Sequence, residues 1–254
     1  MPQVPVEYWI ALAIPLSYAV LIAIERCLDT GWRWPAHRGW ELIGVSCFLL
    51  QTLVNGTVSA ALGKMLPGAH LFDAMRLGLA GAIVVGFLAQ TFGNALLHLA
   101  YHRSDFLWRW VHQLHHAPAR MGVSGVMIVS PLEMLCAAVL FVSISRFVLG
   151  LDPVATMSVA FLASFYGMFQ HWNARTPRWL GWLIQRPEQH CEHHRRGVHA
   201  GNYSDFPLWD FCWNGFSNPR DFDGELGFGD GAASRAAALL AGRDLGRERA
   251  RSDG

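Results

Sequence analysis

Charged residues are scarce in this chain of 254 residues: they make up 15% of it, against a usual share of about 25%. A disordered chain has many charges and few apolar residues, whereas this chain is 52% hydrophobic, so disorder is excluded. The formal net charge of +1 gives no overall field that would attract nucleic acid. The charges are missing from long runs rather than thinned evenly, which argues against an ordinary soluble domain.

Several common motifs are absent as well. The five cysteines form no C-x-x-C pair and their odd number fits no closed disulfide framework, so we expect reduced thiols. The chain has no P-loop, no G-x-G-x-x-G and no C-x-x-C-H motif, and too few clustered cysteines for an iron–sulfur centre. The absence of H-E-x-x-H argues against a zinc protease. No repeat and no second domain is evident, so residues 1–254 are expected to form one domain.

Long apolar runs are what the sequence does have. A helix that crosses a bilayer needs about 20 mostly apolar residues. Charges occur in only one of the runs, with Glu133 near one end and Arg146 near the other, where both could reach an interface. No basic segment precedes the first run, so it is not a cleavable signal peptide. We predict an all-α, polytopic membrane helix bundle with about five spans, at residues 8–24, 42–63, 77–97, 131–150 and 153–170.

The distribution of cations predicts the orientation. If the loop after the first span is cytoplasmic, all but three of the 20 Lys and Arg residues lie inside, the exceptions being Lys64, Arg76 and Arg146. This asymmetry follows the positive-inside rule. We therefore expect the N-terminus outside, the C-terminus and most histidines at the cytoplasmic side, and, in a bacterium, residence in the plasma (inner) membrane.

The segments between and after the spans are expected to form a cytoplasmic cap. Asp105–Ala117 and Pro177–Gln185 combine Trp with Arg and favour short helices in the membrane interface, or an aromatic belt that anchors the spans. Residues 98–130 and 171–226 would make up this metal-binding cap. The C-terminal tail, 227–254, contains a helix-forming stretch at Ala232–Ala241 and is expected to end in a mobile tip.

Eight of the twelve histidines fall in three clusters, H-x-x-x-H at 98–102 and H-x-x-H-H at 112–116 and 190–194. Residues three or four apart share a helix face, so each cluster should present its imidazoles in one direction. A lone histidine in an apolar helix is usually an interior hydrogen-bonding residue, but this density favours metal ligation. Eight nitrogens exceed one ion's needs, which predicts two ions. His37 and His70 lie outside the clusters and are expected to be incidental.

Polar residues also line two of the spans. In the third span, Gln90 and Asn94 continue the four-residue spacing of His98 and His102, giving one polar stripe that leads toward the first histidine cluster. In the second span, Gln51, Asn55 and Ser59 repeat the pattern, where hydrogen bonding between helices is as good an explanation as function.

These motifs together resemble the fatty acid hydroxylase/sterol desaturase superfamily of integral-membrane di-iron oxygenases. The resemblance covers roughly His98 to Asp210 and rests on six stretches: HLAYHR (98–103), HQLHHAP (112–118), SPLE (130–133), QHWN (170–173), RPEQHCEHH (186–194) and NYSDFPLWD (202–210). An isolated H-x-x-x-H is weak evidence, but three histidine boxes in this order and spacing are specific.

The resemblance implies a set of ligands for two iron ions, with zinc possible on overproduction. The ligands would be the eight clustered histidines and a ninth at the end of the fifth span, namely His98, His102, His112, His115, His116, His171, His190, His193 and His194. A supporting role around the ligands is implied for His199, Asn202, Trp209 and Asp210, with a surface role equally open for His199.

The resemblance also implies the activity: O2-dependent hydroxylation or desaturation of an unactivated C–H bond. The substrate would be a lipid-like molecule entering sideways from the bilayer, such as a fatty acyl chain, a sterol, a carotenoid or a polar lipid. Electrons would come from a separate ferredoxin or cytochrome with its reductase. Arg186, Arg195 and Arg196 could form its docking site, although positive-inside bias explains them equally well.

Two non-oxygenase alternatives remain. A metal transporter would place its polar groups near the bilayer midplane, whereas these histidines lie at or beyond the helix ends, so the ions are expected to be retained. A non-catalytic membrane metal-binding or storage protein would hold the same ions without consuming O2.

Overall fold

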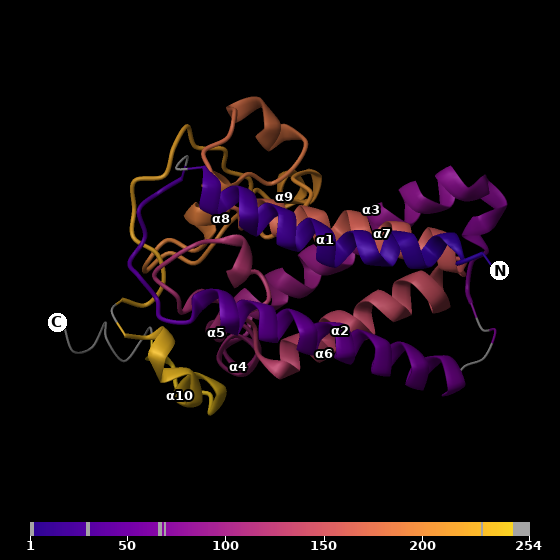
Figure 1. The fold of residues 1–254 in the computed structure, drawn as a ribbon, viewed down its shortest axis with the longest axis horizontal. Helices are drawn as coiled ribbons and strands as arrows, with labels where there is room; N and C mark the ends of the chain where they lie inside the picture. Colours follow the sequence, from indigo (N-terminus) through magenta and orange to yellow (C-terminus); the bar gives the residue numbers. More distant parts are fainter. Residues whose placement is uncertain (1–2, 29–30, 66–67, 69, 230, 246–254) are drawn as a thin grey trace.

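The computed structural model describes residues 3–28, 31–65, 68, 70–229 and 231–245, and in this part of the chain it contains helices and no β-strand. Five long helices form the body of the molecule: α1 (Val6–Cys27), α2 (Trp40–Met65), α3 (Gly78–Arg103), α6 (Pro131–Val142) and α7 (Pro153–Gln170). Helix α7 packs between α1 and α3, and α6 packs against both α2 and α3 (Figure 1).

Shorter helical segments join and cover these helices. They are η1 (Ala74–Leu77), α4 (Asp105–Leu107), η2 (Trp108–His112), α5 (Gln113–His116), η3 (Val123–Gly125), η4 (Ser143–Val148), η5 (Arg178–Trp182), α8 (Pro187–His193), α9 (Leu208–Cys212), η6 (Ala233–Arg235) and α10 (Ala236–Leu240). The segments η2 and η4 are π-helical turns. Figure 1 shows α5, α8 and α10 gathered at one end of the bundle, opposite the N-terminus.

Local sequence determines where two of the long helices begin. The Ser130 hydroxyl accepts a hydrogen bond from the Glu133 N–H at 3.0 Å, and Pro131 occupies the first helical position of α6. Asp152 and Pro153 repeat this arrangement at α7, where the carboxylate accepts from the Ala155 N–H at 2.7 Å. A side-chain cap followed by proline satisfies an end N–H and fixes a helical φ, so both starts are strongly specified.

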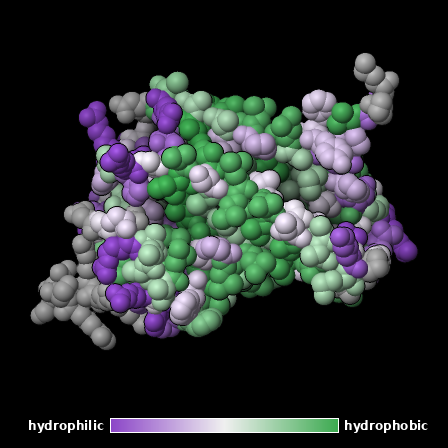
Figure 2. Space-filling model, turned by 60° about the horizontal axis from the view of Figure 1, so that its bottom comes forward, coloured by the Kyte–Doolittle hydropathy of each residue, from purple (hydrophilic) through white to green (hydrophobic). Residues whose placement is uncertain are grey.

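Four helices are long and apolar enough to cross a membrane: Val6–Cys27, Trp40–Met65, Ala74–Arg103 and Pro131–Val148. The fifth predicted span, 153–170, is present as helix α7 with the predicted bounds. This helix is less apolar than the other four, so the count of five spans is approximate. Apolar residues cover the middle of the molecule and polar residues gather toward its two ends (Figure 2). Side chains such as Leu12, Leu16, Leu49 and Leu53 are exposed on the outer helices. A surface of this kind is covered by lipid in an integral membrane protein.

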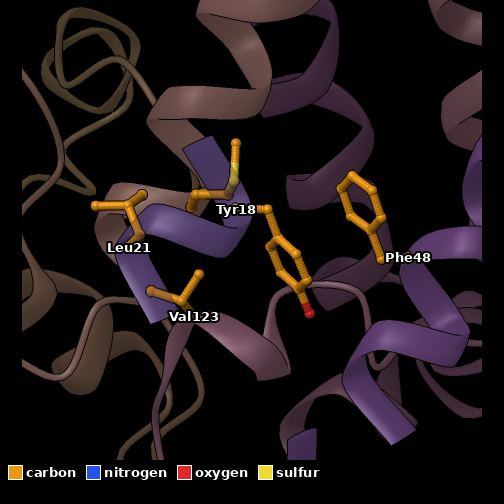
Figure 3. Packing of buried hydrophobic residues seen from close by; sticks show 5 residues of the cluster. Tyr18, Leu21, Phe48 and Val123 are labelled. Carbon is orange, nitrogen blue, oxygen red and sulfur yellow. The ribbon is translucent and has the colours of Figure 1, made fainter. Parts of the chain in front are cut away.

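Helices α1 and α2 are joined through the turn η3 rather than by extensive direct packing. Tyr18 of α1 stacks on Phe48 of α2 with ring centroids 4.5 Å apart, and the Tyr18 hydroxyl donates to the Ser124 carbonyl at 3.3 Å. Leu21, Val123 and Met168 complete this cluster. Figure 3 shows Leu21 and Val123 beside Tyr18 and Phe48. The cluster thus fixes the position of η3, which lies in the loop that follows the second histidine box.

The C-terminal part covers the same end of the bundle. Gln113 donates to the Leu239 carbonyl at 3.0 Å, and Leu239 packs in an apolar cluster with Ala117, Phe228, Ala232 and Leu245. The predicted helix at Ala232–Ala241 is therefore present as η6 and α10. The predicted mobile tip, 246–254, lies outside the described residues.

Candidate metal centre

The three histidine boxes meet at one end of the bundle. His98 and His102 occupy the last turns of α3, which continues past the predicted end of the third span. His112, His115 and His116 follow on η2 and α5, and the third box lies on and just after α8. His171 is the C-cap of α7 and is also buried here. The predicted nine histidines are thus brought together by elements far apart in the sequence.

These nine histidines form two groups in which the candidate ligand atoms all lie within 4.8 Å of one another. The first group contains five histidines: His98, His102, His112, His116 and His193. The second contains four: His115, His171, His190 and His194. The rings of His116 and His194 stack at 4.0 Å, so the two groups lie side by side.

Each H-x-x-H-H box contributes to both groups. In the second box His112 and His116 belong to the first group and His115 to the second. The third box reverses this division, with His193 in the first group and the other two in the second. Successive residues of a helix are turned by about 100°, so the first and last histidines of a box face one way and the middle histidine, at the fourth position, faces another. The expectation that each box points in one direction is therefore wrong for these two boxes.

Within each group the Nε2 atoms approach one another closely. In the first group, the Nε2 of His98 lies 2.9 Å from that of His112, which lies 3.0 Å from that of His116. In the second, the Nε2 of His190 lies 3.0 Å from those of His171 and His194. Ligands at right angles around an ion, with bonds of about 2.1 Å, are about 3.0 Å apart. The spacing therefore fits neighbouring ligands on a shared ion.

The other ring nitrogens show which Nε2 atoms lack a proton. His98 Nδ1 lies 2.7 Å from the Tyr203 carbonyl, and His112 Nδ1 lies 2.8 Å from Glu133 Oε1. A carbonyl only accepts, so His98 Nδ1 donates and its Nε2 carries a lone pair, and Glu133 in its ionised form has the same effect on His112. Two lone pairs facing each other at 2.9 Å cannot form a hydrogen bond. They can instead both bind a cation, so the donor set fits a metal ion.

Burial keeps these imidazoles neutral. Removal from water, together with the repulsion expected between neighbouring imidazolium charges, lowers the pKa of His116 and His194 well below the ordinary value. Burial lowers the pKa of His171 to about 4. Neutral imidazole is the form that binds metals, so the cluster is in its ligating state at neutral pH.

Backbone carbonyls orient other histidines. His193 Nδ1 donates to the Gly201 carbonyl at 2.6 Å, and His171 Nδ1 donates to that of Gly167 at 2.8 Å. Asp210 accepts the N–H groups of Tyr203 and Ser204 at 2.8 and 3.0 Å, which fixes the carbonyl that His98 binds. This contact is compatible with the supporting role predicted for Asp210.

The other three predicted supporting residues differ in how near they lie to the ligands. His199 is in direct contact, with its Nδ1 3.1 Å from the Nδ1 of His116. Asn202 acts through the backbone, donating to the Gln189 carbonyl of α8 at 3.0 Å. Trp209 donates to Thr91 at 3.0 Å and packs on Phe92, so its contacts attach α9 to α3 rather than to a histidine.

Two sequence interpretations need correction. Glu133 does not extend to an interface: it is largely buried and pairs with His112, although its SPLE motif was the signal that could have identified it. Arg186 does not form a docking surface, because it is fully buried and pairs with Glu188 at 2.8 Å. It also donates to Thr176, Asn218 and Pro219. Arg195 and Arg196 have acidic partners too, Glu192 with Asp223 and Glu225 respectively.

The two remaining histidines lie outside both groups, as predicted. The ring of His37 packs on that of Trp40 with centroids 5.7 Å apart. His70 lies beside Gly150, in the connection between η4 and α7.

Membrane-length helices and two converging histidine groups define a membrane-embedded helical protein with a candidate metal centre of two sites. A protein-family model described as fatty acid hydroxylase matches residues 83–214, just over half of the chain and including all three histidine boxes. The chain therefore belongs to the fatty acid hydroxylase family, and the resemblance inferred from the motifs is confirmed. No curated protein and no solved structure matched the chain. Membership indicates an oxidoreductase of membrane-oxygenase type, in a family that is typically iron-dependent.

Proposed function

We propose that the protein is a membrane-bound di-iron oxidoreductase that uses O2 to hydroxylate or desaturate an unactivated C–H bond of a lipid-like substrate. The observation that carries this proposal is the pair of histidine groups, in which imidazole Nε2 atoms converge at metal-ligand spacing. The family supplies the reaction class. In this proposal residues 1–254 act as one catalytic domain, with 98–130 and 171–226 forming the cap over the spans.

The donor set favours iron over a structural zinc site. The first group offers five imidazoles, and zinc is almost always four-coordinate. Imidazole suits iron as well as zinc, so zinc could replace iron on overproduction. The nine histidines listed above would hold the two ions, and bound iron would supply the O2 activation that an unactivated C–H bond requires.

The chain's own residues would prepare this site in three ways. Burial holds the imidazoles neutral, so they bind metal without first losing a proton. Glu133 and the Tyr203 carbonyl hold the Nδ1 protons of His112 and His98, which aims both Nε2 lone pairs at the same point. The segment from Phe228 to Leu245 covers the outer side of the second box and limits its exposure to water.

The substrate would reach the centre from the bilayer. The histidines lie where α3 and α7 end, directly beyond the apolar parts of these helices, so a lipid held among the helices could bring a C–H bond to them. From the cation distribution we expect this end at the cytoplasmic face, where a soluble ferredoxin or a cytochrome with its reductase would deliver electrons. Of the arginines expected to dock such a donor, Arg186 is buried and is excluded, whereas Arg195 and Arg196 are partly exposed and pair with acidic side chains of the cap.

Comparative lipid mass spectrometry tests the proposal. Lipids from cells with and without the gene should differ in one species that has gained an oxygen atom or lost two hydrogen atoms. The His115→Ala variant should abolish this species, because it removes one of four nitrogens from the second group, whereas His70→Ala should not. Two irons per chain without any lipid product would favour a metal-storage protein and contradict the oxygenase proposal.

A further inference from the structure

A small pocket reaches the second histidine group from the loop that follows the second box. It is lined by three of that group's four histidines together with Trp40, Arg120, Gly122 and Gly125. Trp40 begins α2, and the two glycines flank the start and end of η3. The pocket therefore lies directly beside candidate metal ligands.

Two buried N–H donors in the pocket lining lack acceptors. Trp40 is 2% exposed, and its Nε1 has no hydrogen-bond partner among the described residues. The same holds for Nε of Arg120, whose guanidinium lies 4.9 Å from the centre of the Trp40 ring. Buried donors are nearly always paired, so their common position in one pocket indicates a ligand that accepts hydrogen bonds.

The glycines preserve the position of the indole. A Cβ on Gly125 would overlap the six-membered ring of Trp40. A Cβ on Gly122 would lie 3.3 Å from Trp40 Nε1 and 2.9 Å from Glu25 Oε1, so Nε1 faces the loop that lines the pocket. The absence of side chains here lets the loop pack directly against the indole that lines the pocket.

The charges around the pocket limit the kind of ligand. Burial lowers the pKa of the Arg120 guanidinium, and the nearby carboxylates of Glu41 and Glu25 offset part of this effect, so its positive charge is partly balanced. Glu41 also pairs with Arg26 at 3.3 Å, and Glu25 accepts the N–H groups of Val123 and Asn173. A large anionic headgroup would meet these carboxylates, whereas a small neutral or monovalent acceptor would not need to displace them.

We propose that this pocket admits a small hydrogen-bond-accepting ligand, of the size of dioxygen, water or a triatomic anion, to the metal held by the second group. Trp40 and Arg120 are positioning residues that donate hydrogen bonds to it. The inference rests on the proposed function, because it requires a metal at the second group.

Azide is a suitable probe, since it is a small acceptor whose binding to ferric iron is seen as an absorption band. Iron-loaded wild-type protein, Trp40→Phe and Trp182→Phe would be titrated with azide, and the iron content of each sample measured. Phenylalanine keeps most of the ring and removes the N–H. A lost hydrogen bond to a charged acceptor should raise the azide Kd about 10-fold or more. Trp182 is exposed on the cap, so its variant should bind as the wild type does.

Arg120→Gln is the second variant, and it decides the result if Trp40→Phe fails to retain iron. A raised azide Kd with full iron content in either variant supports the pocket. Unchanged azide affinity in both variants, or no azide binding by iron-loaded wild type, overturns the inference while leaving the iron centre intact. A wild-type chain that binds no iron instead overturns the proposed function, so the two failures are distinguishable.

Discussion

Glu133 provides the sharpest test of the metal centre, because it contacts a candidate ligand without being one. Its Oε1 lies 2.8 Å from His112 Nδ1, and the two side chains are 13% and 3% exposed. Glu133→Ala would leave the Nδ1 proton without an acceptor and free the ring to turn. Loss of such a partner typically lowers metal affinity about 10–100-fold, or about 1.4–2.8 kcal/mol. The first group should lose affinity and the second should keep its ion.

Chelator competition followed by metal analysis measures this effect. The expected result is a two-step curve for Glu133→Ala, with one ion removed at a lower chelator concentration than in the wild type. Glu133→Gln keeps an amide oxygen that accepts the same proton and should lose less. Glu192→Ala is the control, because this residue pairs with Arg195 at the cap surface. Wild-type affinity for both ions in Glu133→Ala would refute the argument from orientation.

Three further predictions address the ligand surroundings, acid sensitivity and topology. His199→Ala should weaken metal binding about 10–100-fold in the same chelator assay, because His199 contacts His116; behaviour like that of His70→Ala would show that it only packs there. The metal-free protein should unfold more easily as the pH falls below about 6.5. Burial lowers the pKa of His171 and His116 in the folded protein, so at mildly acid pH the unfolded chain binds more protons at these side chains than the folded chain does. A denaturation midpoint that does not move between neutral and mildly acid pH would contradict this prediction. A reporter fused at the C-terminus should be cytoplasmic and one inserted near Gly68 external, and the reverse pattern would invert the orientation.

The membrane helices were predictable because lipid imposes a simple requirement. An uncharged run of sufficient length must be helical in a bilayer, and every predicted span is a helix in the structure. The less apolar α7 shows the limit of this reasoning, since packing between α1 and α3 buries part of its surface within the protein. A helix partly shielded by neighbours does not have to be as apolar as one that faces lipid.

The convergence of the nine histidines was also predictable, but their division into two groups was not. Four-residue spacing correctly pairs His98 with His102, and the same spacing pairs His112 with His116. Whether His115 and His193 join the first or the second group depends on how α5 and α8 are oriented relative to each other. This orientation is determined by long-range packing. The role of Glu133 was missed for a similar reason, because its partner lies 21 residues earlier on a different helix.

The two histidine groups differ in size, so the two candidate metal positions differ in how many ligand positions they leave open. A group of five imidazoles leaves few positions open on an ion that takes five or six ligands, whereas a group of four leaves more. The pocket at Trp40 reaches the group of four and not the group of five. Because the two H-x-x-H-H boxes contribute to both groups, the positions of two bound ions would be coupled through α5 and α8. A small ligand entering by this pocket would therefore meet the more open ion first, while the five-histidine group holds its neighbour at a fixed position beside it.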